Sequence, residues 1–230
     1  MPRVRRLLVL SCLLLLLSAC AGAPSTRAPL IPDQVSNAAW EQDMQRFATE
    51  DRANPPPEHP VLFVGSSSFR LWESLAADFP GIPVLNRGFG GSEVRDSTWY
   101  ADRIIIPYRP KTILLYAGDN DIAAGRTPEQ VRADFVAFVE RVRRDLPDTR
   151  ILYVAIKPSP SRAQLLDAQR RANDLVRAES QRLGVTFVDV FTPMLDAAGK
   201  PREELFIADR LHMNAAGYAI WRELITPLIR

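Results

Sequence analysis

An unbroken apolar run that stops at a glycine and three serines constrains the fold of this chain more than any other stretch. The run, Val61–Val64, is typical of a strand that is buried on both faces of a parallel sheet. Ser66–Ser68 follow after the glycine, and Phe69 and Trp72 then resume an apolar pattern with helical spacing. The serines are therefore predicted at a strand-to-helix turn, at the sheet edge where open α/β folds bind their ligands. The alternative is that they only cap the helix, which serine does well.

Four further apolar runs indicate more strands, and helical patterns separate them. The expected strands cover residues 61–64, 82–85, 112–116, 150–157 and 185–190. Helices are expected over about 33–53 and 161–183, from Thr127 onward and from near Asn214 onward. Strands that alternate with helices predict βαβ units and a mostly parallel sheet covered by helices on both sides. We therefore expect one α/β domain over residues 33–230.

The first residues of the chain carry the pattern of a secretory leader. Arg3, Arg5 and Arg6 precede an apolar run over 7–17, which is short for a membrane span, and small residues follow it. Leu17–Cys20 resembles the bacterial lipobox, in which the cysteine becomes the lipidated first residue after cleavage. We therefore expect a lipoprotein signal peptide over residues 1–19, a lipid on Cys20 and a tether over 20–32. This predicts a protein of the bacterial cell envelope, anchored by lipid and facing the periplasm or the exterior.

Charge and cysteine content narrow the possible partners. Loss of the three leader arginines changes the formal charge from +2 to 2 − 3 = −1. The remaining chain has no basic stripe with interleaved aromatic residues, so no nucleic-acid partner is expected. The only cysteines are Cys12, inside the leader, and Cys20, which leaves no pair for a disulfide.

The two histidines of the chain differ in their surroundings. His59 sits in a proline-rich loop and is expected at the surface. His212 ends the run Asp209–His212, directly before the last helix. Nucleophilic hydrolysis needs a hydroxyl, a base and a carboxylate that holds the base in the right tautomer. An aspartate three residues ahead of a histidine can bond its near ring nitrogen and leave the far one for a serine, although any exposed turn can contain this pair.

Four blocks of the sequence, taken in order, resemble the SGNH or GDSL family of serine hydrolases. The blocks are Gly65-Ser66-Ser67, Asn86-Arg87-Gly88-Phe89-Gly90-Gly91-Ser92, Gly118-Asp119-Asn120-Asp121, and Asp209 with His212. The resemblance implies a three-layer α/β/α sandwich around a five-stranded parallel sheet, as in flavodoxin-like folds. The chain departs from many members of the family at Ser66, where they have aspartate. The Gly-x-Ser-x-Gly elbow of the α/β-hydrolases is absent.

The resemblance also implies roles for individual residues. Ser67 would be the nucleophile, His212 the base and Asp209 the acid that orients it. The N–H groups of Ser67 and Gly91 and the side-chain amide of Asn120 would form the oxyanion hole. No metal and no other cofactor is implied.

The implied activity is that of a serine esterase, acting on short acyl esters, above all acetyl esters, of carbohydrates or cell-envelope polymers. The expected partners are a small ester or acylated glycan and a membrane reached through lipid on Cys20. Three alternatives stay open: a lysophospholipase or thioesterase of the same family, a non-catalytic glycan-binding envelope lipoprotein, and a nucleotide-binding flavodoxin-like protein. No phosphate loop of the Walker type supports the last.

Several polar and aromatic residues have a structural interpretation beside a functional one. Asn120 can cap a turn, and Asp119 and Asp121 are interpreted as loop caps. Lys157, Ser159 and Arg162 follow the fourth strand, where a salt bridge is the expected role. Four large aromatic residues are predicted to pack in the core: Trp72, Trp99, Tyr218 and Trp221.

Overall fold

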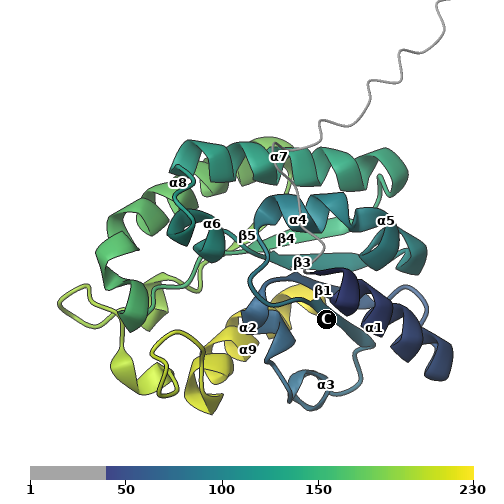
Figure 1. Ribbon diagram of the computed structural model, residues 1–230, viewed down its shortest axis with the longest axis horizontal. Coiled ribbons are helices and arrows are strands. Elements are labelled where there is room, and N and C mark those ends of the chain that lie inside the picture. The colour runs from purple at the N-terminus through teal and green to yellow at the C-terminus, as the bar shows by residue number, and fades with distance from the viewer. Residues whose placement is uncertain (1–39) are drawn as a thin grey trace, which may run out of the picture.

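A five-stranded parallel sheet lies between two layers of helices in the computed structural model, which describes residues 40–230 (Figure 1). The strand order is β2-β1-β3-β4-β5, and every neighbouring pair is parallel. The strands are β1 Val61–Gly65, β2 Val84–Gly88, β3 Thr112–Tyr116, β4 Arg150–Val154 and β5 Thr186–Val188. The predicted fold class is confirmed, but β2 begins two residues later than expected and β4 and β5 are shorter.

Side chains alternate between the two faces of the sheet, so each face has its own core. In β1, Leu62 and Val64 pack into one core, and Val61 and Phe63 pack into the other. The first core is covered by α1 Glu41–Ala53, α4 Val94–Trp99, α5 Ala101–Ile104, α6 Asp119–Ala123, α7 Pro128–Asp145 and α8 Leu166–Leu183. The second is covered by α2 Ser67–Arg70, α3 Leu75–Asp78 and α9 Ala215–Ile229. Because both faces are covered, β1, β3 and β4 are mainly apolar, whereas β2, at one edge of the sheet, includes Asn86 and Arg87.

Aromatic rings fill much of the second core. Trp72 stacks on Tyr218 with ring centroids 5.0 Å apart, and Trp221 is fully buried beside them. The Tyr218 hydroxyl donates to the Ser68 carbonyl at 2.9 Å, which joins α9 to α2. Three of the four aromatic core predictions are therefore confirmed. The fourth is wrong: Trp99 is 47% exposed, because α4 turns its other side, with Val94 and Thr98, toward the core.

The sheet topology brings the ends of β1 and β3 together at the point where the strand order reverses direction. Ligands bind at this switch point in open α/β sheets. At the end of β1 the chain turns at Gly65, which has φ 130°. A Cβ there would lie 2.0 Å from the Tyr116 carbonyl oxygen, so only glycine fits. The serines after β1 and Asn120 after β3 thus share one edge of the sheet.

Two helix starts that the sequence predicts are confirmed with their caps. The Thr127 side chain accepts from the Gln130 N–H, and Gln130 bonds back to the Thr127 N–H, forming a capping box for α7. The Asn214 side chain accepts from the N–H groups of Ala216 and Gly217 and caps α9. The helix expected over 161–183 is divided into a 3₁₀ segment, Pro160–Leu165, and α8.

The expected leader, the lipidated Cys20 and the tether to residue 32 lie outside the described residues. The same holds for the start of the first expected helix, of which Glu41–Ala53 is described. Within residues 40–230, none of the helices combines the length and the apolar character needed to span a bilayer.

Candidate active site

Ser67, His212 and Asp209 form a continuous chain of side-chain contacts at the carboxyl end of the sheet. Ser67 is the first residue of α2, and its Oγ lies 3.0 Å from His212 Nε2. His212 Nδ1 lies 2.6 Å from Asp209 Oδ2. A carboxylate at Nδ1 holds the proton on that nitrogen and leaves Nε2 to accept from the serine hydroxyl. The structure therefore brings together the three residues that the sequence singled out.

A tight turn positions the acid and the histidine. Asp209 Oδ1 accepts from the backbone N–H groups of Leu211 and His212, each at 2.9 Å. Arg210, which follows Asp209 directly, has a left-handed backbone with φ 59°. Burial would raise the pKa of Asp209, but the hydrogen bonds from the backbone and ring of His212 and from Leu211 outweigh it and lower the pKa to about 2. The carboxylate therefore stays ionised at any pH near neutrality.

Two residues from different segments, Ser67 at the start of α2 and Gly91 in the loop after β2, line one pocket and carry unpaired backbone N–H groups within the described residues. Gly91 has φ 80°, a conformation that favours glycine, and lines the same pocket as Ser67. Within residues 40–230, neither the Gly91 N–H nor the Ser67 N–H has a hydrogen-bond partner. The loop that carries Gly91 is held from α1, because the indole N–H of Trp40 donates to the Gly90 carbonyl at 2.9 Å. These two N–H groups are therefore available to a bound anion.

The Asn120 side chain points into the same pocket but already has partners. Its Nδ2 donates to Ser66 Oγ at 2.7 Å and to the Ser92 carbonyl at 3.0 Å. Its Oδ1 accepts from Arg162 at 3.0 Å. A charged oxygen in the pocket would compete with two neutral acceptors for the amide, and charge-assisted hydrogen bonds are the stronger ones. Ser66, at the position where the family resemblance is weakest, thus contacts the amide directly.

A buried charged cluster lies behind Asn120. Asp119 is 4% exposed and accepts from Gln169 at 2.9 Å and from Lys157 at 3.1 Å. Its other contact is with the Arg162 guanidinium at 2.8 Å. The interpretation of Asp119 as a loop cap is wrong, because it is the shared anion of two cations. The salt-bridge interpretation of Lys157 and Arg162 is correct, and Arg162 lines the pocket as well.

Sequence reasoning missed this cluster, although one signal was present. Lys157 and Arg162 follow β4, and Asp119 follows β3, which is the neighbouring parallel strand. Residues that follow neighbouring parallel strands meet at one edge of a sheet. Ser159 is fully buried as well, and its hydroxyl has no hydrogen-bond partner in the described chain.

Asp121, the last residue of the Gly118–Asp121 block, is also buried, but its side chain contacts α4 instead of the Asp119 cluster. Its Oδ1 accepts from the Val94 N–H at 3.1 Å, which ties α6 to the start of α4. Burial raises the pKa of Asp121 to about 8, and this hydrogen bond only partly opposes it. Asp121 therefore caps a neighbouring helix, rather than its own loop as expected.

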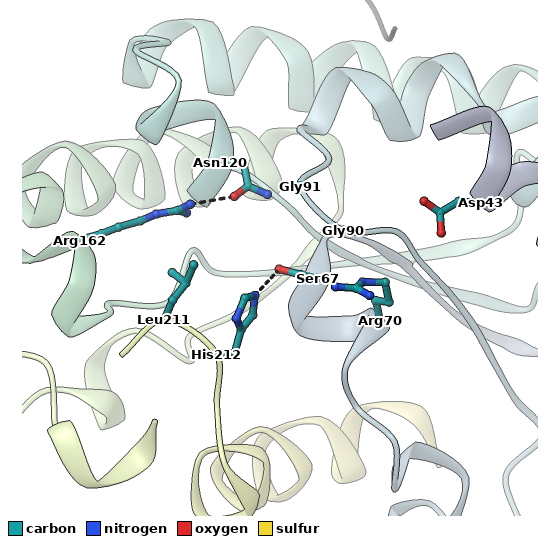
Figure 2. Close-up of a pocket in the computed structure, with 9 residues that line it drawn as sticks. All are labelled: Asp43, Ser67, Arg70, Gly90, Gly91, Asn120, Arg162, Leu211 and His212. Atoms are coloured by element: carbon teal, nitrogen blue, oxygen red, sulfur yellow. Dashed lines mark hydrogen bonds between the residues drawn. The ribbon is translucent and has the colours of Figure 1, made fainter. Parts of the chain in front are cut away.

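These side chains surround an open pocket of about 480 Å³ (Figure 2). In Figure 2, Asn120 and Arg162 lie on one side of Ser67 and Arg70 lies on the other. The lining residues are Asp43, Ser67, Arg70, Gly90, Gly91, Asn120, Arg162, Leu211 and His212. Among the described lining residues, Leu211 is the single aliphatic side chain. The pocket is thus lined mainly by polar and charged side chains and by glycine.

The remaining candidate groups lie elsewhere or form no site. His59 is exposed, as expected, and its Nδ1 lies 2.9 Å from the Arg109 carbonyl, away from the pocket. In the part of the chain that the structure describes, no three His, Cys, Asp or Glu side chains are arranged to hold a metal ion.

Comparison with known proteins gives a consistent result. The sequence profile of the GDSL-like lipase/acylhydrolase family matches residues 57–220. The chain is 26% identical over 218 residues to the platelet-activating factor acetylhydrolase IB subunit alpha1 of Bos taurus, covering 90% of each chain.

Solved structures share the fold at lower sequence identity. A GDSL-like lipase from Bacteroides thetaiotaomicron has a TM-score of 0.69 at 22% identity, covering 81% of this chain and 96% of that one. A catalytic mutant of an acetylxylan esterase from Geobacillus stearothermophilus has a TM-score of 0.63 at 15% identity, covering 76% and 95%. These likenesses agree with the sheet order and layers described above.

Proposed function

Because the chain belongs to the GDSL-like lipase/acylhydrolase family and is a carboxylic ester hydrolase, we propose that it works as a serine esterase with Ser67 as nucleophile, His212 as base and Asp209 as orienting acid. The observation that carries this proposal is the contact chain itself. Ser67 Oγ lies 3.0 Å from His212 Nε2, and His212 Nδ1 lies 2.6 Å from Asp209. Both distances lie within the range for proton transfer between a nucleophile, its base and the group that orients the base.

In the proposed mechanism, His212 Nε2 takes the proton of Ser67 Oγ as that oxygen attacks the ester carbonyl carbon. The carbonyl oxygen becomes an anion, and the tetrahedral intermediate then expels the alcohol, which receives the proton from His212. A water molecule attacks the acyl-enzyme with the same base and releases the acid. Asp209 stays ionised throughout, since its pKa is about 2, and stabilises the imidazolium.

The developing oxyanion would be held by three donors: the N–H groups of Ser67 and Gly91 and the amide of Asn120. The first two have no partner within the described residues, so they lose no hydrogen bond when the anion forms. Asn120 would share or exchange one of its present acceptors, Ser66 Oγ or the Ser92 carbonyl. A donor of this kind contributes about 3 kcal/mol to transition-state stabilisation in other hydrolases.

The proposed substrates are short acyl esters, above all acetyl esters, of a carbohydrate or a cell-envelope polymer. The polar pocket lining supports a small acyl group, because one aliphatic side chain, Leu211, covers too little area to bury a long chain. Two of the similar proteins are named as an acetylhydrolase and an acetylxylan esterase. The lysophospholipase or thioesterase alternative requires an acyl groove beyond this pocket. The glycan-binding alternative does not require the contact between Ser67 and His212.

The proposal retains the expected location at the bacterial cell envelope, anchored by lipid on Cys20 and facing the periplasm or the exterior. Its support is the basic and apolar leader and the lipobox-like Leu17–Cys20. Radiolabelled fatty acid that is incorporated by the whole chain, and not by Cys20→Ala, is the expected result in a bacterial host.

The test of the activity is hydrolysis of p-nitrophenyl acetate, butyrate and octanoate by the purified protein beside Ser67→Ala and His212→Ala. The expected result is turnover that is fastest with acetate and falls by about 10⁴-fold or more in both variants. Comparable rates with octanoate would favour the lipase-like alternative. A Ser67→Ala variant that keeps its rate would remove the proposed nucleophile.

A further inference from the structure

The contacts of Arg162 point to a role that the proposed mechanism has not used. We propose that Arg162 is a positioning residue for the Asn120 amide, and that the buried pair of Asp119 and Lys157 holds it in place. The inference rests on the proposed oxyanion role of Asn120. It adds three residues outside the triad to the machinery of the reaction.

The guanidinium of Arg162 bridges two consecutive residues of α6. One nitrogen lies 2.8 Å from Asp119 Oδ1, and the other donates to Asn120 Oδ1 at 3.0 Å. Arginine has only donors, fixed in a planar fork. The amide atom that faces Arg162 must therefore be the oxygen, which turns the Asn120 N–H groups toward Ser66, Ser92 and the pocket. Arg162 thus holds the oxygen end of the amide, while Ser66 and Ser92 hold its N–H groups.

The same contact changes the strength of the amide as a donor. A cation on Oδ1 draws electron density through the amide, which strengthens the hydrogen bonds that Nδ2 donates. Arg162, which also lines the pocket, thus acts on an oxyanion through Asn120.

Burial makes the arrangement rigid and leaves a surplus of positive charge. The side chains of Lys157 and Asp119 are 1% and 5% exposed, and that of Arg162 is 18% exposed. Burial would raise the pKa of Asp119, but Lys157 and Arg162 outweigh it and lower the pKa. The cluster therefore holds two cations and one carboxylate. The uncompensated charge lies behind the amide, where the transition state gains an anion, and low solvent access preserves its effect.

The steady-state test uses Arg162→Gln and Arg162→Lys with Arg141→Gln as the matched control. Arg141 is also a buried arginine paired with aspartates, Asp102 and Asp145, but it lies on α7 and does not line the pocket. We expect Arg162→Gln to lower kcat by about 10- to 100-fold with KM changed by less than about threefold, a loss smaller than removing the donor itself. Arg162→Lys keeps the charge but not the fork and should be intermediate. Arg141→Gln should keep kcat even where it lowers the melting temperature.

Each kinetic outcome decides a specific point. A rise in KM at constant kcat in Arg162→Gln would make Arg162 a substrate-binding residue and overturn the inference. Equal kcat values in Arg162→Gln and Arg141→Gln would show that Arg162 has only a structural role and would overturn the inference. If Asn120→Ala keeps its activity, the proposed oxyanion role of Asn120 fails. If Asn120→Ala loses activity and Arg162→Gln does not, only the positioning inference fails.

A measurement that needs no substrate tests the contact itself. The side-chain amide signal of Asn120 in a ¹H–¹⁵N spectrum is identified by its loss in Asn120→Ala. We expect it to shift or broaden in Arg162→Gln and to stay unchanged in Arg141→Gln. An unshifted signal in Arg162→Gln would overturn the inference whatever the activity of the protein.

Discussion

Asp209 and Asp119 are both carboxylates of the site, and they are held in opposite ways. Asp209 lies in an exposed turn, with its side chain 43% accessible, and takes its hydrogen bonds from residues two and three positions later. Asp119 is buried and is held by Lys157, Arg162 and Gln169, which lie 38 to 50 positions away in the sequence. The contacts of Asp209 therefore follow from local chain geometry, and those of Asp119 follow from the tertiary fold.

The two carboxylates therefore contribute to the protein in different ways. Water already solvates an exposed aspartate, so Asp209 adds little to folding and acts mainly on the orientation of His212. A buried aspartate between two cations pairs with charges that would otherwise be buried without a partner. Asp119 therefore stabilises the fold as well as the site. The comparison therefore predicts separate effects on activity and on stability.

The largest effect is expected for Asp209→Asn. The new amide would place an N–H against His212 Nδ1 and reverse the tautomer, so Nε2 could no longer accept the Ser67 proton. We expect kcat to fall by about 10³- to 10⁴-fold, as in other triads, while the free energy of unfolding changes by less than about 1 kcal/mol. Single-turnover hydrolysis and urea denaturation measure the two quantities. A large loss of stability at unchanged kcat would contradict the assignment of Asp209 to activity rather than to folding.

The next largest effect is expected for Asp119→Asn, and it falls on stability. Loss of the carboxylate leaves Lys157 and Arg162 buried beside each other, and breaking such a cluster costs about 3 kcal/mol or more. The free energy of unfolding from denaturant titration measures this. Asp102→Asn is the control, because Asp102 also pairs with a buried arginine but is 72% exposed, and it should cost less than about 1 kcal/mol. Equal losses in both variants would contradict the importance of burial.

The smallest effect is expected in acid. Both aspartates have a lowered pKa in the folded protein, so each contributes stability above the ordinary aspartate pKa and loses it as the pH falls through the folded value. The stability gap between the parent protein and Asp119→Asn should therefore narrow below about pH 4, since a protonated aspartate resembles asparagine. For Asp209→Asn the gap is small at neutral pH and should close near pH 2. Denaturant titrations at pH 7, 4 and 2.5 measure these differences in unfolding free energy. A difference that grows in acid would contradict the expected direction of the pH dependence.

The same contrast explains what the sequence could predict. The Asp209–His212 turn and the serines after β1 were recognised because their geometry follows from neighbours in the chain and from four blocks in order. The bounds of β3 and the cap of α7 were predicted for the same reason. These features depend on periodicity, on turn chemistry or on a local pair of residues.

The features that the sequence did not predict depend on contacts between distant segments. The Asp119 cluster requires β3 and β4 to be neighbours, and the contact of Ser66 with Asn120 requires β1 and β3 to be neighbours. The extension of β2 beyond residue 85 has a similar cause: Asn86 donates to the Phe69 carbonyl, and Arg87 is buried against Tyr108 and Asp51, so polar residues continue the strand. Trp99 was assigned to the core by residue type, whereas the orientation of α4 exposes it.

The proposed nucleophile and its proposed base are separated by 145 positions in the sequence. A ribosome completes Ser67 and all five strands before it reaches His212. The growing chain therefore carries the proposed nucleophile without its base until His212 is added. A product of premature termination after β5 would therefore retain the sheet segments but lack the proposed base for Ser67.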